Sequence, residues 1–191
     1  MRRMRGPALG IVESSSVARG IVIADAALKR SPALLVHSRA TSGGKHLTIL
    51  EGGVAEIDEA MAAARAAAGD RLIDSLLLPA ADDQVWPMLG APVVPADWSA
   101  DTSAESVALI ETRTVCAALV AADAATKCAD VVVRDVRLAV DLAGKAYFSM
   151  TGDLDAIQAA SDAAIEAAGD RLVDAEIIAQ PAPELRGQLF R

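Results

Sequence analysis

Few residues in this chain have the type and the spacing that chemistry requires. Gly44-Lys45 could suggest a phosphate loop, but that motif needs a glycine five residues before the Gly-Lys pair and a Ser or Thr after the lysine, and here His46 follows. The only histidines, His37 and His46, have no cysteine or carboxylate at metal-ligand spacing. No serine, cysteine or lysine has an evident base partner. We therefore predict no catalytic residue, no metal site and no cofactor.

The two cysteines, Cys116 and Cys128, are expected on one helix over residues 115–128. Their spacing separates them by roughly 18 Å along a helix, whereas a disulfide needs Cα atoms within about 7 Å. We predict that both are buried and act as small hydrophobic residues.

Composition excludes several classes of protein. The 191-residue chain has a net charge of −8, which argues against a nucleic-acid interface because such an interface needs a basic face. No apolar run approaches the ~20 residues of a membrane span, so we expect a cytosolic protein without a membrane partner. The chain is 53% hydrophobic but only 3% aromatic, so each core residue buries little area. Domains of roughly 90 residues built this way are marginal alone, which favours oligomerisation.

An internal repeat organises the chain. Residues 13–29 (ESSSVARGIVIADAALK) and 111–127 (ETRTVCAALVAADAATK) are identical at eight of seventeen positions, at an offset of 98. Residues 67–74 and 167–174 agree at seven of eight positions, at an offset of 100. The change of offset indicates a two-residue insertion after Arg137. We therefore predict a first domain over 7–90, a linker over 91–105 and a second domain over 106–191.

Each repeat has the pattern β-α-β-β-α-β. In the first repeat, strands are expected at 9–13, 33–39, 46–50 and 71–78, with helices at 17–30 and from residue 54. In the second they are expected at 107–111, 130–136, 146–150 and 171–179, with helices at 115–128 and from residue 154. Ser16 and Thr114 are predicted N-caps, and Gly69 and Gly169 are predicted to take a left-handed conformation after a helix.

These repeated motifs, with the TGDLDAI helix start at 151–157, resemble the bacterial microcompartment shell (BMC) domain. Two such domains in the unpermuted order resemble the trimeric, tandem-domain class of shell protein. The resemblance implies an α/β (α+β) fold of two ferredoxin-like units. It also implies a homotrimer that forms a pseudohexameric tile in the microcompartment shell, beside hexameric and pentameric shell proteins. Small metabolites would pass through a pore on the threefold axis.

The resemblance also assigns roles to particular residues. The loop between the second and third strands would line the pore. In the first repeat this loop consists of Thr41, Ser42, Gly43 and Gly44. In the second repeat it follows Asp141 and consists of Leu142, Ala143 and Gly144. The second loop is more apolar and two residues longer, so we expect Ser42 and Gly43 to form the narrowest ring.

Two lysines match the family's tile-edge lysine, Lys29 and Lys127, although each could simply be a solvated cation at a helix end. The family's arginine partner in a Pro-Arg-Pro turn is absent, since Leu78-Pro79-Ala80 and Gln180-Pro181-Ala182 stand there. Some members hold an iron–sulfur cluster through a loop cysteine; the loops here have none, so we expect no cluster. The alternatives are a ligand-binding regulator built from the same repeat and an enzyme with a site at the domain junction.

Overall fold

One hydroxyl side chain caps the N-terminus of the first helix in each repeat, as predicted. Ser16 Oγ accepts a hydrogen bond from Arg19 N at the start of α1 (Val17–Arg30), and Thr114 Oγ1 accepts one from Ala117 N at the start of α4 (Val115–Cys128). Both helices have the predicted bounds. Each hydroxyl satisfies one of the backbone N–H groups that the first helical turn leaves without a partner.

The structure is a computed structural model that describes residues 8–86, 106–139 and 142–186. The described chain divides into two compact units, one made of residues 8–81 with those of 139–144, the other of residues 82–138 with 145–186. The predicted linker over 91–105 lies outside the described residues. None of the described helices has the length and apolar character needed to cross a membrane.

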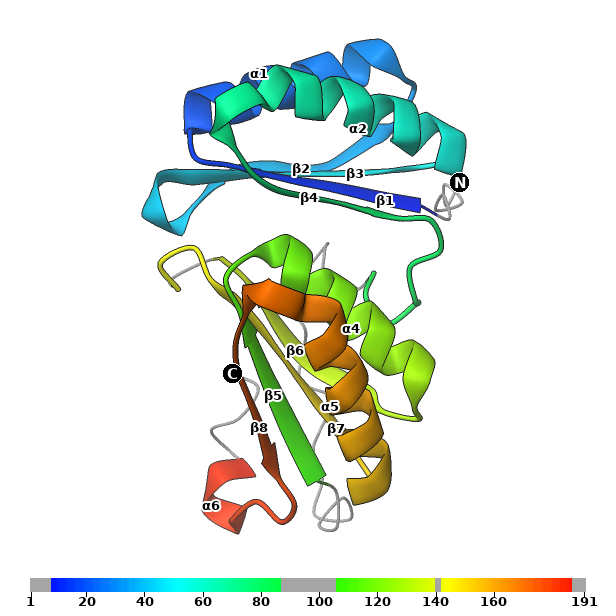
Figure 1. Ribbon diagram of the computed structural model, residues 1–191, viewed down its shortest axis with the longest axis vertical. Helices are drawn as coiled ribbons and strands as arrows, with labels where there is room; N and C mark the ends of the chain where they lie inside the picture. The colour runs from blue at the N-terminus through cyan, green and yellow to red at the C-terminus, as the bar shows by residue number, and fades with distance from the viewer. Residues whose placement is uncertain (1–7, 87–105, 140–141, 187–191) are drawn as a thin grey trace. The chain divides into compact units, whose positions relative to one another are not determined.

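Both units confirm the predicted order of elements. After α1 or α4 come two strands, a helix and a last strand (Figure 1). The bounds in the first unit are β1 (Ala8–Ser14), β2 (Leu34–Thr41), β3 (Lys45–Gly52), α2 (Val54–Ala68) and β4 (Leu72–Leu78). Those in the second unit are β5 (Ser106–Thr112), β6 (Val132–Leu138), β7 (Ala146–Gly152), α5 (Leu154–Ala168), β8 (Leu172–Ile178) and the short α6 (Pro183–Arg186).

Each unit is one four-stranded antiparallel sheet with its two helices on one face. The strand orders are β2-β3-β1-β4 and β6-β7-β5-β8, the ferredoxin-like order. The edge strands β2 and β6 carry a register irregularity at the same place, between Leu35 and His37 and between Val133 and Asp135. This irregularity aligns the two strands at the offset of 98 seen in the sequence.

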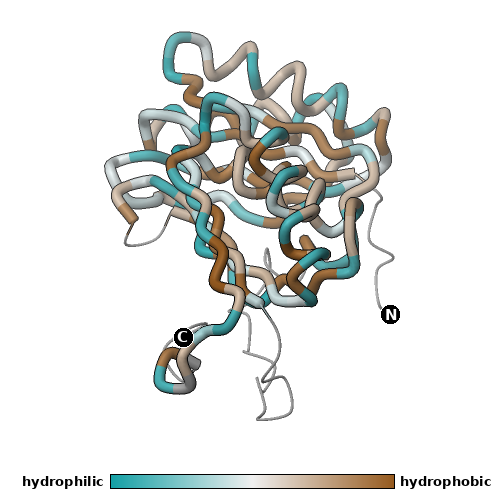
Figure 2. Tube along the Cα trace, turned by 60° about the horizontal axis from the view of Figure 1, so that its bottom comes forward, coloured by the Kyte–Doolittle hydropathy of each residue, from teal (hydrophilic) through white to brown (hydrophobic). Residues whose placement is uncertain are grey.

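The core of each unit lies between the sheet and its helices. Figure 2 shows hydrophobic residues concentrated along the strands and recurring along the helices. In the first unit, a packed cluster combines Val12 and Leu50 from the sheet with Ile23, Ile57 and Met61 from the helices. Every residue of the central strand β1 is buried, including the charged Glu13.

Two details differ from the sequence predictions. Gly69 and Gly169 both have φ of 55°, but their ψ values of −131° and −133° lie outside the left-handed helical region. Residues 82–86, placed by prediction at the end of the first domain, pack with the second unit. Asp82 N donates to Asp123 Oδ1 at 2.7 Å, and Val85 and Trp86 in this segment are buried.

Candidate functional site

The loop after β2 is built on two glycines. Ser42–Gly44 form a single 3-10 turn in which Gly43 and Gly44 have φ of 77° and 72°. L side chains rarely adopt such values, so glycine is required here for the backbone to turn directly into β3. Both glycines are exposed, whereas Thr41 and Ser42 are partly buried. The loop therefore presents backbone rather than large side chains.

The described part of the second predicted pore loop packs within the first unit, beside this turn. Ser42 N donates to Ala139 O at 3.0 Å, and Lys45 Nζ donates to Gly144 O at 2.9 Å. Gly144 has φ of 84°, which favours glycine, and a Cβ added there would lie 2.7 Å from Cε of the flexible Lys45 side chain. The structure thus brings the two predicted loops together.

The second loop takes a less usual path than the first. Ala139 and Ala143 have φ of 59° and 50°, although neither is glycine. Such values cost an L-residue energy and persist only where the surroundings hold them. Ala143 is exposed and Leu142 is partly buried, while Asp141 lies outside the described residues. The strain at the two alanines was not apparent in the sequence.

The two predicted edge lysines occupy equivalent places in the last turns of α1 and α4. Lys29 Nζ lies 2.7 Å from Asp25 Oδ2, and Lys127 Nζ lies 2.7 Å from Asp123 Oδ2. Each pair links residues four apart on one helix, and each ammonium also favours the negative helix end. The two aspartates differ, because Asp25 is exposed and Asp123 is buried.

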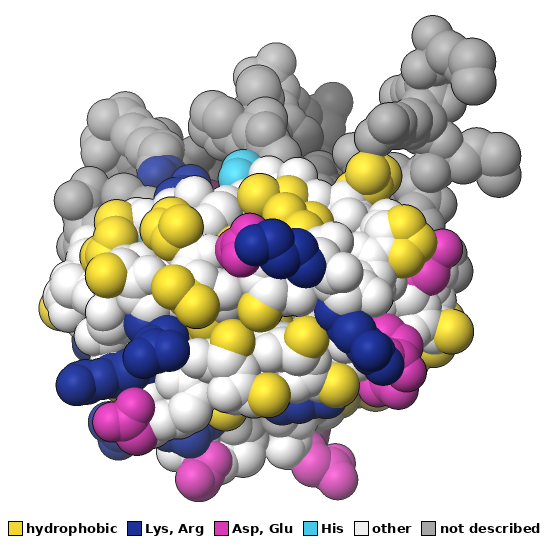
Figure 3. Space-filling model, turned by 90° about the horizontal axis from the view of Figure 1, so that it is seen from above, with side chains coloured by type: hydrophobic (Ala, Val, Ile, Leu, Met, Phe, Trp, Pro, Cys, Tyr) yellow, Lys and Arg dark blue, Asp and Glu magenta, His cyan; other side chains and the backbone are white. Residues whose placement is uncertain are grey.

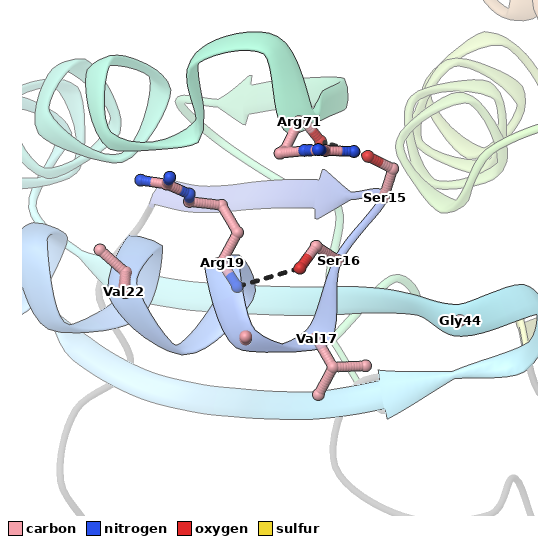
Figure 4. Close-up of a pocket in the computed structure, with 8 residues that line it drawn as sticks. Ser15, Ser16, Val17, Arg19, Val22, Gly44 and Arg71 are labelled. Atoms are coloured by element: carbon pink, nitrogen blue, oxygen red, sulfur yellow. Dashed lines mark hydrogen bonds between the residues drawn. The ribbon is translucent and has the colours of Figure 1, made fainter.

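A surface pocket of about 720 Å³ lies at the start of α1 (Figure 4). Its walls include Ser15, Ser16, Arg19, Gly44 and Arg71. In Figure 4 both guanidinium groups lie on the side of the pocket nearest α2 and β4, and the Arg19 side chain also donates to Ala67 O at 3.3 Å. Sequence reasoning did not identify these arginines. The lining residues include no histidine, cysteine or carboxylate, so the pocket carries no evident acid, base or nucleophile.

His46 is a core residue beneath α1. A Cβ added to Gly20 would lie 2.1 Å from His46 Cγ, so the helix reaches the ring only because residue 20 is glycine. The ring nitrogens lie 3.3 Å from Ser38 Oγ and 3.5 Å from Thr48 Oγ1. Burial lowers the pKa of His46. Burial, and then the charge of Arg39, lowers the pKa of His37. Both histidines therefore favour the neutral form.

The prediction for the cysteines is half right. Cys116 is buried on α4, as expected, but Cys128 is exposed at the end of that helix, where its Sγ lies 3.7 Å from Ala159 O. The prediction of a buried Cys128 is wrong because the last helical turn extends past the core of the unit. Neither cysteine lies in a pore loop.

A polar cluster on β6 and β7 was also missed. Arg137 Nε donates to Asp135 Oδ2 at 2.9 Å, and Tyr147 OH lies 3.5 Å from the same oxygen. The hydrogen bond to Asp135 is the main cause that raises the pKa of Arg137. Burial, followed by the Asp135 charge, raises the pKa of Tyr147. The sequence did contain a signal for this cluster. Asp135 and Arg137 are two residues apart on one strand and so lie on the same face, and Tyr147 pairs with Arg137 on the neighbouring strand.

Comparison with known proteins identifies the family to which the chain belongs. The BMC domain model matches residues 8–81 and 106–181, which together are most of the chain. The chain belongs to the BMC-domain family, the shell proteins of bacterial microcompartments.

Relatives agree with this assignment. The chain is 34% identical over 176 residues to the bacterial microcompartment shell protein PduT of Citrobacter freundii, covering 91% of this chain and 92% of that protein. A crystal structure of a microcompartments protein from Desulfitobacterium hafniense DCB is 28% identical with a TM-score of 0.78, covering 94% of this chain and 98% of the other. A fused permuted hexameric shell protein of the RMM microcompartment shares the fold at 21% identity and a TM-score of 0.58, covering 83% of this chain and 79% of the other.

The protein is therefore a shell protein of a bacterial microcompartment with two tandem BMC domains, and its place is in that shell. The family has a structural role, which favours a shell component over the alternative of a ligand-binding regulator.

Proposed function

We propose that three copies of this chain close head to tail into a ring of six domains. The ring is a flat tile of the shell, and small metabolites pass through the opening at its centre. Two units with the same fold offer similar but non-identical surfaces, and head-to-tail contacts of that kind form rings when the rotation closes. Hexameric and pentameric shell proteins are the proposed neighbours of the tile.

The observation that carries the proposal is the exposed apolar face of α1. Val17 and Ile21 on this helix are 40% and 55% exposed, and Val22 is 48% exposed. A patch of large exposed apolar side chains on one helix indicates a surface that another chain covers. A neighbouring copy of this chain would supply that cover.

The proposed pore lining consists of Thr41, Ser42, Gly43 and Gly44 with Leu142, Ala143 and Gly144. Support comes from the packing of the two loops against each other and from the exposed backbone of Gly43, Gly44 and Ala143. Hydroxyl and N–H groups are neutral hydrogen-bonding groups suited to polar or anionic small molecules. Lys29 and Lys127 are proposed to contact the neighbouring tile, because both lie on exposed helix ends.

Sedimentation of the purified chain tests the ring, and electron microscopy with a hexameric shell protein tests the tile. We expect the mass of three chains and incorporation into sheets or shells. Persistent monomers that never enter such assemblies would contradict the proposal.

The pore is tested separately in assembled shells. Ser42→Phe should reduce entry of small polar molecules, whereas Ala62→Phe, at an exposed position on α2, should not. Equal entry for both variants would exclude the 41–44 loop from the opening.

A further inference from the structure

The first repeat ends in a turn that packs on the second unit. Val85 N donates to Asp82 O at 3.0 Å, which closes the turn, and Val85 is fully buried. The Asp82 N–H binds the carboxylate of Asp123 on α4. Gln84 bonds to the outer edge of β6 through both of its side-chain groups, with Nε2 donating to Val131 O at 3.0 Å and Oε1 accepting from Val133 N at 2.9 Å.

The second repeat ends in the same turn, but among the described residues this turn is more exposed. Leu185 N donates to Ala182 O at 2.9 Å, the bond found between residues 85 and 82 at an offset of 100. However, Leu185 is 42% exposed whereas Val85 is buried. The C-terminal turn (residues 182–186) thus has the same closing hydrogen bond as residues 82–85, but its Ala182, Glu184 and Leu185 are exposed.

The surface that would receive this turn is present on the first unit and is also exposed. At the offset of 98, Asp25 on α1 corresponds to Asp123, and Leu35 on β2 corresponds to Val133; the matching register irregularities support this alignment. Asp25 and Leu35 are exposed, and β2 is an edge strand with no strand beyond it among the described residues. Ile21 and Val22 lie on the same helix as exposed apolar residues. Figure 3 looks onto the helical layer of this unit and shows hydrophobic side chains interspersed with charged ones.

We propose that the C-terminal turn of one copy docks on α1 and β2 of the next copy, repeating between chains the contact that residues 82–86 make within the second unit. This inference rests on the proposed ring and names the segment that links its members. In the docked state the residue 182 N–H donates to the Asp25 carboxylate, and Leu185 is covered by the α1 face. Glu184 replaces Gln84, so its carboxylate accepts from Leu35 N–H but cannot donate to Ala33 O.

The substitution of glutamate for glutamine makes the contact between chains weaker than the one within the unit. Gln84 provides one donor and one acceptor, whereas an ionised glutamate only accepts. One side-chain hydrogen bond is lost at this position, so the docked turn depends more on Leu185 and on Asp25.

Cross-linking of the full chain tests the contact. In a Cys128→Ser background, which removes the exposed cysteine, Leu35→Cys and Leu185→Cys are combined and treated with a short bismaleimide. We expect covalent ladders of two and three chains on a denaturing gel. Each single-cysteine variant is the control and should not form the three-chain species.

The outcomes separate this inference from the ring itself. A chain that sediments as a trimer but gives no cross-link between residues 35 and 185 would overturn the docking and leave the ring intact. Cross-linked dimers without trimers would support the docking and contradict the threefold ring. Cross-linking only within one chain, or only to another shell protein, would overturn the docking.

A second measurement uses no cysteine. Leu185→Asp should weaken association tenfold or more in sedimentation, with the circular dichroism of the chain unchanged. Ile165→Asp, which alters a comparably exposed residue on α5, should leave association as it was. Equal effects of the two substitutions would count against a specific role for the C-terminal turn.

Discussion

The two units share one fold but fill it differently. Under the first helix, the first unit combines Gly20 with His46, whereas the second combines Ala118 with Ala146. Between the central strand and the second helix, the first unit combines Gly10 with Met61, and the second combines Ala108 with Ser161. In the first unit each glycine faces a large side chain, whereas the second unit has small residues at both of the equivalent positions. Because interiors are close-packed, a duplicated fold keeps its geometry only when such pairs change together.

The units also differ in what their first helices expose. On α4, Asp123 accepts a hydrogen bond from Asp82 N, and the segment 82–86 also bonds to β6. On α1 the equivalent Asp25 is exposed, as are the apolar Val17 and Ile21. The first helix therefore holds a segment of the chain in the second unit and offers a surface for association in the first.

The largest effect is expected from truncating the buried helix face. Leu119→Ala should lower the free energy of unfolding by about 2–5 kcal/mol, because it leaves a cavity in place of a fully buried side chain. Ile21→Ala, at the equivalent position on α1, should change the stability of the unassembled chain by no more than about 0.5 kcal/mol. Urea unfolding at concentrations where the chain is monomeric measures both. Similar losses for the two variants would show that the helices do not differ as described.

The next largest loss of stability is expected from adding one methyl group to α1. Gly20→Ala should cost about 1–3 kcal/mol of unfolding free energy, because the new Cβ would overlap the His46 ring. Gly20→Ala with His46→Ala reproduces the Ala118–Ala146 pair of the second unit and should recover much of that loss. Urea unfolding of the two single variants and the double variant gives the coupling. Additive effects would contradict the idea of a matched pair.

A buried hydroxyl in the second unit provides a smaller test. Ser161 Oγ is buried without a hydrogen-bond partner among the described residues. Ser161→Ala should therefore leave the protein as stable or stabilise it by about 1 kcal/mol. Thr112→Val is the contrast, since the Thr112 hydroxyl donates to Thr114 O at 2.8 Å and its loss should destabilise the unit. Thermal unfolding compares them, and a clear destabilisation by Ser161→Ala would show that the hydroxyl has a partner.

The smallest effect is expected from pH, and it should arise in the first unit. His37 and His46 have lowered pKa values in the folded chain. In the unfolded chain they titrate near the ordinary value of about 6.5, so below that pH the unfolded chain binds more protons. Stability should therefore be fully present above about pH 6.5 and fall as the pH drops toward the folded pKa values. In the Gly20→Ala, His46→Ala double variant, the urea midpoint should change less between about pH 8 and 5.5 than it does in the original chain. An unchanged pH dependence of the midpoint would exclude His46 as a contributor.

Much of the fold could be predicted because the evidence for it is local or repeated. Ser16 and Thr114 precede apolar runs with helical spacing, so both helix starts were predicted to the residue. The repeat at offsets of 98 and 100 indicated two units of the same order. The loop and edge residues were assigned through the family resemblance, and their roles stay predictions.

What the sequence could not indicate depends on contacts between distant segments. The residues next to Gly20 in the sequence do not indicate that the His46 ring from β3 lies beneath it. Cys128 and Cys116 share one helix, yet only packing distinguishes the exposed residue from the buried one. Positive φ at Ala139 and Ala143 is likewise imposed by surroundings rather than by residue type.

By itself, the sequence determined the two-fold repetition, the order of strands and helices and the family, because periodicity, capping and repeated motifs are properties of neighbouring residues. Only the tertiary structure decided that residues 82–86 belong with the second unit, that Val17 and Ile21 on α1 are exposed, and that Leu185 in the C-terminal turn is more exposed than Val85. Burial is a property of what surrounds a residue, and two nearly identical segments can have different surroundings.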